Sequence, residues 1–460
     1  MTRNRRNATT LTAGENVTYA APFDVFGHPS TGNHGMQFET CLSRRSGWAE
    51  GQPISHLMHK ALAHPHLISL AAGFVDQPTL PVEPTRQALD ALLNDPIRGL
   101  AALQYGTTAG LASLREAVLA RFRQADGDPD SERSLDIDQV IVTAGSNQLL
   151  HLVCDTLLDP GDIVLCAAPS YFVFLGMIAN LGARAVGVAA DENGMIPEAL
   201  DEQLQRLDAS GELERVKAIY VTTYFDNPGS VTLSAQRRPQ IVESAHQWSK
   251  DSKIFIIEDT AYRDLRYFGE DIPSLRSFDP DGKTVIVAQT FSKSYSPGIR
   301  VGWGILPEEL VEPVCNQKGN LDFGSPNFSQ HLMDKVLELG LFDEHVEQLR
   351  GNYRLKLQAM LDAADEHFGN LPGVGWLRPT GGLYVWLQLP EIIETGPSGQ
   401  LFEATLEEGT LYVPGEYCYP NEGPWKPKNM IRLSFGVQSP ERIRDGMEGL
   451  ARAVSKLAKG

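Results

Sequence analysis

From about residue 85 the chain alternates between two hydrophobic patterns. Segments with apolar residues at helical spacing predict helices, including residues 110–124, 146–158 and 234–251. Between them, short runs of apolar and β-branched residues predict buried strands, at residues 139–145, 163–169, 217–223, 253–259, 284–290 and 301–306. Strands that alternate with helices predict βαβ units and a mostly parallel sheet covered by helices on both faces.

After about residue 325 the pattern changes. An amphipathic segment of residues 343–368 predicts one long helix, and a second segment, 440–458, predicts a final helix. Widely spaced apolar runs lie between them, at residues 381–389, 410–415 and 430–435. This texture is typical of a smaller α+β domain attached to the α/β one.

We therefore predict an α/β fold with two domains and an N-terminal extension. Residues 1–50 are polar and have no sustained periodicity, so they predict a largely disordered extension. The other predicted parts are an N-terminal segment that packs with the small domain (51–84), a large cofactor-binding domain (85–330) and the small C-terminal domain (331–460).

Charge and composition exclude several classes of protein. A net charge of -18 argues against general nucleic-acid binding, which needs a basic face. No apolar run approaches the roughly 20 residues of a membrane span, so we expect no membrane partner. The five cysteines are scattered and form no close cluster with histidine, so we expect a reducing, cytoplasmic compartment and no metal site.

Polar residues follow three of the predicted strands. They are Gly145-Ser146-Asn147 before a helix, Asp259 to Tyr262, and Thr290, Ser292 and Lys293. Each group alone has an ordinary interpretation: a helix N-cap, a surface carboxylate or a solvated loop lysine. In an open α/β sheet, however, ligands bind at the carboxyl ends of the strands, so we expect the three groups to meet there.

Together, these groups match the requirements of one cofactor. A helix N-terminus, two hydroxyls and Arg300 could bind a phosphate. Pyridoxal 5'-phosphate (PLP) needs such a phosphate site, a lysine amine for its aldehyde and an anion beside its ring nitrogen. Lys293 and an acidic residue such as Asp259 would supply the last two.

Several motifs resemble those of one family. The stretch TFSKSYSPGIRVGW is similar to the lysine motif of the PLP-dependent class I/II aminotransferases (fold type I, the aspartate aminotransferase superfamily). LQYGTTAG, TAGSNQLL, IIEDTAYRDL, PTGGLYVWL and IRLSF follow in the family's order. The resemblance covers residue 45 to the C-terminus and is strongest for the α-aminoadipate/kynurenine aminotransferase branch. It implies transamination of an L-amino acid with a 2-oxo acid.

The resemblance also implies a role for individual residues. Lys293 would form the Schiff base and carry the α-proton, and Asp259 would pair with the ring nitrogen. Tyr262 and Asn227 would bind the phenolic oxygen, and Tyr171 would stack on the ring. The phosphate would be held by Gly145, Ser146, Asn147, Thr290, Ser292 and Arg300.

For the substrate and the assembly, the resemblance implies further roles. Arg432 would bind the α-carboxylate, with Gly73 and Asn227 beside it. Tyr105 would reach the phosphate of a partner subunit, which implies a homodimer with shared active sites.

The chain departs from the family pattern at two places. The usual NPTG is NPGS here, which retains Asn227. Some relatives that accept an acidic side chain carry an arginine in the first helix, where this chain has Ser55. We therefore expect an apolar or aromatic donor bound by Phe74, Tyr384 and Tyr417, although aminoadipate stays possible. Acidic amino acids would be used less well, or mainly as the common glutamate partner through a rearranged arginine such as Arg44 or Arg45.

Two alternatives remain at this point. The same fold and cofactor support β-lyases, decarboxylases and synthases, because fold does not fix chemistry. Some transcription regulators carry this domain behind a DNA-binding module, but only about 50 polar residues precede it here.

Overall fold

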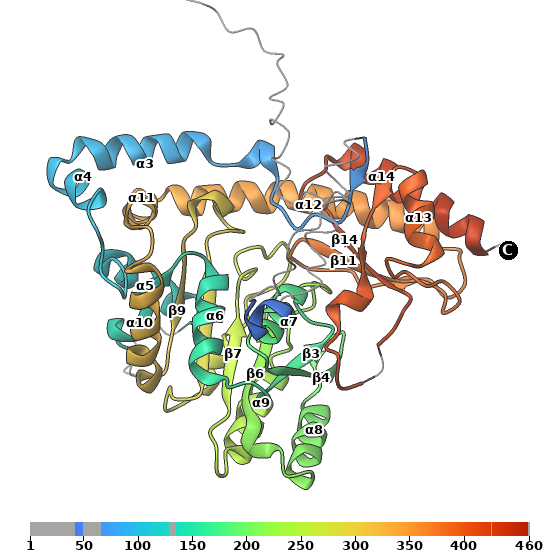
Figure 1. Cartoon of the computed structure of the whole chain (residues 1–460). Coiled ribbons are helices and arrows are strands. Elements are labelled where there is room, and N and C mark those ends of the chain that lie inside the picture. Colours follow the sequence, from blue (N-terminus) through green and yellow to red (C-terminus); the bar gives the residue numbers. More distant parts are fainter. Residues whose placement is uncertain (1–41, 49–65, 128–134, 425, 459–460) are drawn as a thin grey trace, which may run out of the picture. The chain divides into compact units, whose positions relative to one another are not determined.

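The computed structural model describes residues 42–48, 66–127, 135–424 and 426–458. Within these ranges the chain forms an eight-stranded sheet, a four-stranded sheet and a short two-stranded pairing. Helices pack around both larger sheets (Figure 1). The predicted α/β class is therefore confirmed, whereas the exact domain boundaries stay predictions.

The eight-stranded sheet has the order β2-β9-β8-β7-β6-β3-β4-β5. Strands β8, β7, β6, β3 and β4 are mutually parallel, and β9 and β5 run antiparallel to their neighbours. The strands are β2 (Val140–Thr143), β3 (Ile163–Ala168), β4 (Arg184–Asp191), β5 (Gly194–Met195), β6 (Val216–Thr222), β7 (Phe255–Asp259), β8 (Val285–Thr290) and β9 (Gly302–Ile305).

Both faces of this sheet are buried, which explains the continuous apolar runs in the sequence. Alternate residues enter different core clusters: Val285 and Val287 pack on one face, and Ile286 packs on the other. Helices α6 (Ser146–Leu157), α7 (Phe172–Asn180) and α10 (Glu308–Asp322) cover the Ile286 face. The opposite core takes side chains from α3 (Val82–Asn94), α5 (Ala112–Ala125), α8 (Pro197–Ala209), α9 (Arg237–Trp248) and α11 (Asn327–Glu338).

The four-stranded sheet belongs to the C-terminal part of the chain. Its order is β10-β11-β14-β13, and all its pairs are antiparallel. Its core is shared with the long helix α12 and the C-terminal helix α14, which pack together (Figure 1). The elements are α12 (Leu341–Phe368), β10 (Gly375–Trp376), β11 (Tyr384–Gln388), α13 (Gln400–Glu407), β13 (Val413–Pro414), β14 (Met430–Ser434) and α14 (Pro440–Ala458).

The segment before residue 84 also contacts the C-terminal part. Strand β1 (Ile68–Ser69) pairs in parallel with β12 (Thr410–Leu411). Two short helices remain: α1 (Arg44–Trp48), in the stretch predicted to be disordered, and α4 (Pro96–Ala102). Among the described residues, no helix is long and apolar enough to cross a bilayer.

Candidate active site

A cavity of about 360 Å³ lies where strands of the large sheet end. Strands β6, β7 and β8 bring Thr222, Asp259 and Thr290 to its wall, as expected for the carboxyl edge of an α/β sheet. Nearly all of the residues predicted for the site line this cavity: Gly73, Ser146, Asn147, Tyr171, Asn227, Asp259, Tyr262, Thr290, Ser292, Lys293, Arg300 and Arg432. Sequence positions more than 350 residues apart therefore meet in one cavity.

One end of the cavity is suited to an anion. Helix α6 begins there at Ser146, so its first backbone N–H groups and its positive dipole end face the same region. The Thr290 hydroxyl donates to Ser292 Oγ at 2.9 Å, and the Arg300 guanidinium lies 3.5 Å from the same oxygen. Two hydroxyls, one guanidinium and a helix N-terminus therefore converge.

Glycine is required behind this end. Gly145 has a φ of 82°, and a Cβ there would lie 2.6 Å from an Arg300 guanidinium nitrogen. A Cβ on Gly302 would lie only 2.5 Å from the Ser146 backbone nitrogen. Any side chain at either position would displace Arg300 or the start of α6. Gly145 itself supports the anion site from behind and does not line the cavity.

A buried carboxylate lies in the wall of the cavity. Asp259 Oδ2 accepts a hydrogen bond from the Tyr220 hydroxyl at 2.9 Å, and Oδ1 accepts one from Ala261 N at 3.0 Å. Burial raises the pKa of Asp259, and these two hydrogen bonds oppose that effect. In the described part of the chain Asp259 forms no ion pair, so a cationic group in the cavity would stabilise its charged form.

The Lys293 amine is held at the same cavity. Its Nζ donates to the carbonyl oxygen of Gly73 at 2.8 Å. Gly73 has no room for a side chain, because a Cβ there would lie 2.9 Å from the Tyr384 hydroxyl. The amine therefore points toward Gly73, which lines the cavity beside Tyr384 of the four-stranded sheet.

Arg432 on β14 is the second cation of interest. It is buried, and it donates to Asn227 Oδ1 at 2.8 Å and to Ala71 O at 2.7 Å. Its Nε–H has no partner in the described part of the chain. A guanidinium has five N–H donors, and an unpaired buried donor is costly, so Arg432 retains capacity for an acceptor such as a carboxylate.

Aromatic side chains form much of the remaining wall. Tyr262 and Tyr384 share a hydrogen bond of 3.1 Å between their hydroxyls. Tyr171 precedes α7 and forms a hydrogen bond with Asn147, and burial raises its pKa to about 12. The pKa of Tyr262 is also raised, chiefly by burial, so both phenols are neutral donors near pH 7.

Some predicted residues lie elsewhere. The Tyr105 side chain is 80% exposed and does not line this cavity. Phe74 and Tyr384 line it as predicted, but Tyr417 does not. Arg44 is exposed, and Arg45 is paired with Asp155 on α6. Ser55 lies outside the described residues.

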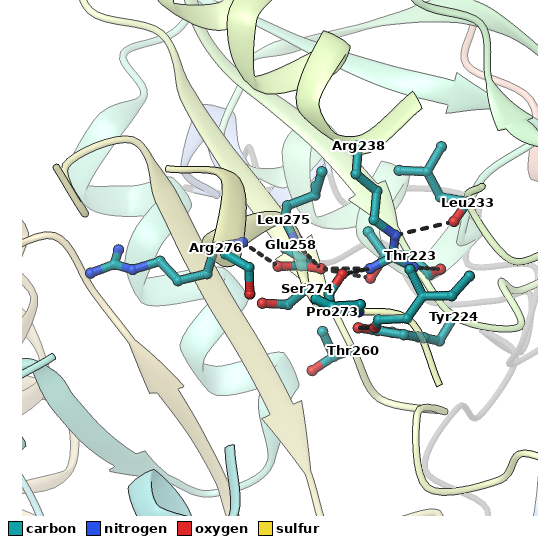
Figure 2. A network of polar contacts seen from close by, with 12 residues as sticks. Thr223, Tyr224, Leu233, Arg238, Glu258, Thr260, Pro273, Ser274, Leu275 and Arg276 are labelled. Carbon is teal, nitrogen blue, oxygen red and sulfur yellow. Dashed lines mark hydrogen bonds and ion pairs between the residues drawn. The ribbon is translucent and has the colours of Figure 1, made fainter. Parts of the chain in front are cut away.

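Glu258, the residue before Asp259 at the end of β7, faces the opposite side of the sheet, where side chains and backbone of the protein itself surround it. Glu258 is fully buried and accepts from the Thr223 hydroxyl and from Leu275 N, both at 2.9 Å. Arg238, also fully buried, lies 3.8 Å from this carboxylate. Figure 2 shows Arg238 among the carbonyl groups to which it donates, those of Leu233, Pro273 and Thr223.

Two residues that matter to the cavity were not predicted. Tyr220 supports Asp259, and its ring stacks on Phe174 at 3.7 Å between centroids. Phe172 lies under Arg432, with its ring centroid 5.3 Å from the guanidinium carbon. Tyr220 lies within the predicted strand 217–223, and Phe172 lies shortly after the predicted strand 163–169. The register between separate strands, which brings Tyr220 next to Asp259, is not encoded in any local motif.

The chain is similar to known proteins over nearly its whole length. A model of the family described as "Aminotransferase class I and II" matches residues 65–450. The aromatic-amino-acid aminotransferase 1 of Thermococcus litoralis is 32% identical over 424 residues, which are 92% of this chain and 96% of the relative.

Solved structures are similar as well. The kynurenine aminotransferase of Pyrococcus horikoshii, in complex with PMP, superposes with a TM-score of 0.83 at 29% identity and covers 91% of this chain and 98% of its own. LysN, the α-aminoadipate aminotransferase of Thermus thermophilus, was solved with N-(5'-phosphopyridoxyl)-L-leucine. It has a TM-score of 0.78 at 30% identity, with the same two coverages of 91% and 98%.

Proposed function

The chain belongs to the class I and II aminotransferases, and we propose that the cavity at the strand ends is its catalytic site. The enzyme carries out PLP-dependent transamination between an amino acid and a 2-oxo acid. The observation that carries the assignment of the site is the convergence of Lys293, Asp259 and Arg432 with an anion site in one cavity.

The described residues fit the cofactor. Ser146, Ser292 and Arg300 would hold the phosphate, together with Asn147 and Thr290. Gly145 and Gly302 leave the room that Arg300 and the start of α6 need behind it. Asp259 would pair with the protonated ring nitrogen, which would supply the cationic partner that the described residues do not give this buried carboxylate. When bound, PLP supplies an aldehyde that combines with amines and a protonated ring that withdraws electrons from the α-carbon.

The chain's other residues orient the ring and move the proton. Tyr171 would cover one ring face, and Tyr262 and Asn227 would bind the phenolic oxygen. The Lys293 amine would take the proton from the α-carbon of the amino acid and return it to the cofactor side. In the chain without cofactor, the hydrogen bond from Nζ to Gly73 O holds the amine at the cavity.

Arg432 would bind the α-carboxylate of both substrates. Its guanidinium plane is fixed by Asn227 and Ala71, so little side-chain freedom is lost on binding. The remaining wall near it is largely apolar, with Phe172, Leu411 and Val413 among its residues. This lining supports an apolar or aromatic donor.

An acidic donor is less well supported. Among the described residues that line the cavity, the cations are Lys293, Arg300 and Arg432, and each has a proposed partner. A distal carboxylate in an apolar pocket without a cation would lose several kcal/mol. Relatives named for aromatic amino acids, kynurenine and α-aminoadipate keep both options open to experiment.

The experiment is a donor screen with product analysis. Purified enzyme with PLP should turn over leucine and phenylalanine to their 2-oxo acids repeatedly only when a 2-oxo acid acceptor is supplied. One equivalent of product per site without acceptor identifies transamination. Release of carbon dioxide or of a β-substituent would instead indicate a decarboxylase or a β-lyase. A kcat/KM tenfold higher for 2-aminoadipate than for leucine would overturn the proposed donor class.

We also propose a homodimer, in which Tyr105 contacts the partner's phosphate site. Tyr105 packs edge-on against Phe323, and both are largely exposed. Large apolar side chains around them are exposed as well: Ile97, Leu100, Leu103 and Leu321. Such a surface is typical of a protein interface. Mixing Lys293→Ala with Tyr105→Ala subunits should restore activity in hybrids, and no recovery after proven exchange would contradict shared sites.

We also propose a cytoplasmic location. It is supported by the cysteines, of which Cys154, Cys166, Cys315 and Cys418 carry free thiols. Fractionation of the native cells, with the enzyme followed by activity, would test it.

A further inference from the structure

Tyr384 lies between Tyr262, proposed to bind the cofactor, and Arg432, proposed to bind the substrate. It begins β11, is 1% exposed and lines the cavity. Its hydroxyl lies 3.1 Å from that of Tyr262, and its ring centroid lies 4.4 Å from the guanidinium carbon of Arg432. It is therefore in contact with both the proposed cofactor side and the proposed substrate side.

Tyr262 and Tyr384 share one hydrogen bond between their hydroxyls, and either hydroxyl can donate it. A phenol has one O–H to donate, and its oxygen can accept. If Tyr384 donates to Tyr262, the Tyr262 hydrogen is free for an acceptor in the cavity. In the described part of the chain, the Tyr262 hydroxyl has no hydrogen-bond partner other than Tyr384, so a hydrogen that it does not donate to Tyr384 would point into the cavity.

We propose that Tyr384 is a positioning residue that directs the Tyr262 hydroxyl into the cavity and supports the plane of Arg432. The inference rests on the proposed function, because it gives Tyr262 its role toward the cofactor's phenolic oxygen. A hydroxyl that accepts one hydrogen bond donates a stronger one, because hydrogen bonds in a chain polarise each other. The Tyr384–Tyr262 pair thus strengthens the contact that Tyr262 makes in the cavity.

The ring of Tyr384 contacts Arg432, and its hydroxyl contacts Tyr262. The ring face supports Arg432 by a cation–π contact, and a phenylalanine would keep that contact. The hydroxyl alone serves Tyr262. Tyr384→Phe removes the hydroxyl and keeps the ring, and Tyr384→Leu removes both.

The test is a spectroscopic pH titration of the holoenzyme in the absence of substrate. A weaker donor at Tyr262 stabilises the deprotonated form of the bound chromophore less. Tyr384→Phe should therefore raise the titration midpoint of the chromophore by about 0.5 pH unit, because the charge-assisted contact of Tyr262 is weakened without being lost. The other ionisable groups facing Tyr262 are Tyr171 and Arg432, and both are unchanged in this variant.

Kinetics separate the two roles. Tyr384→Phe should lower kcat by about 3- to 10-fold and leave the KM for the amino acid within about twofold. Tyr384→Leu should in addition raise that KM by about 5- to 30-fold, because Arg432 loses its support. Tyr412→Phe is the matched control: this buried tyrosine donates to Thr395 O at 2.9 Å, and its loss should shift neither the midpoint nor KM.

The outcomes distinguish the inference from the proposed function. If wild-type enzyme transaminates and titrates but Tyr384→Phe has an unchanged midpoint and kcat, the positioning role is wrong. An equal shift in Tyr412→Phe would also contradict it, because a general loss of packing would then explain both. If the wild-type enzyme shows neither titration nor transamination, the proposed function itself fails.

Discussion

Two adjacent carboxylates end strand β7, and they face opposite sides of the sheet. Glu258 lies among groups that the chain itself supplies: the Thr223 hydroxyl, Leu275 N and the Arg238 guanidinium (Figure 2). Asp259 has one hydroxyl, one backbone N–H and an open cavity. Burial is the largest cause of a raised pKa for both.

The difference separates a structural group from a functional one. A buried carboxylate whose partners all come from the fold has no need of a ligand, whereas one that faces a cavity and forms no ion pair does. The same contrast holds for two buried arginines. Arg238 donates to three carbonyl groups, whereas the Nε–H of Arg432 has no partner among the described residues and lies beside the cavity.

The sharpest test of this contrast exchanges each acid for its amide. Asp259→Asn should bind PLP and unfold near the wild-type temperature, but its kcat should fall about a thousandfold or more, because an amide cannot keep the ring nitrogen protonated. Glu258→Gln should keep its kcat within about threefold and lose about 1–3 kcal/mol of stability, because a buried charged partner of Arg238 becomes neutral. Steady-state kinetics and urea unfolding measure the two effects.

The result that would break the comparison is the reverse pattern. An Asp259→Asn enzyme with near-normal kcat would show that Asp259 is not the ring partner. A Glu258→Gln enzyme with normal stability but little activity would place the functional group on the filled face.

The arginine pair provides a second test, with a smaller effect. Arg432→Lys should lower kcat/KM for the amino acid by about 100-fold, mainly through KM, because a lysine cannot form the two-pronged contact with a carboxylate. Arg238→Lys should instead cost about 2 kcal/mol of stability and leave KM unchanged, since it loses carbonyl hydrogen bonds. Equal effects of both variants on KM would contradict the distinction.

A third carboxylate, that of Asp226, forms no ion pair with the described residues and has no place in the proposed chemistry. Asp226 accepts from Val231 N at 2.6 Å, and burial raises its pKa from 3.8 to about 7. The folded chain therefore binds this proton more tightly than the unfolded chain. Its contribution to stability is full below pH 4 and is lost as the pH rises through about 7.

Replacing Asp226 tests whether its raised pKa contributes to the pH dependence of stability. Asp226→Asn should unfold with less dependence on pH between about 4 and 7 than the wild-type enzyme, as followed by urea unfolding at several pH values. Its relative stability should improve as the pH rises. A steeper decline in the variant would show that another group governs this range.

Much of this arrangement could be predicted from the sequence. The strands are short apolar runs with distinct ends, so the helix-strand order and the polar residues at the strand ends were predicted. Lys293, Asp259 and Arg300 follow from those ends together with the family motif. Strand β4, with the half-buried residues of Arg184–Asp191, carries a weaker apolar signal and was not predicted.

The remainder depends on contacts between distant segments. The support of Asp259 by Tyr220 follows from the register of β6 and β7, in which Thr222 lies opposite Asp259. The contact of Tyr384 with Arg432 follows from the pairing of β11 with β14. Neither register is specified by local spacing. The contrast between Glu258 and Asp259 is likewise invisible in the sequence, where both are acids after one apolar run.

The central claim is that the cavity-facing groups at the strand ends hold PLP through Lys293. Reduction of the holoenzyme with borohydride, followed by peptide mapping, tests this most directly. We expect the pyridoxyl group on the peptide that contains Lys293, and no labelling of Lys293→Ala. Attachment to another lysine of the wild-type protein would contradict the account.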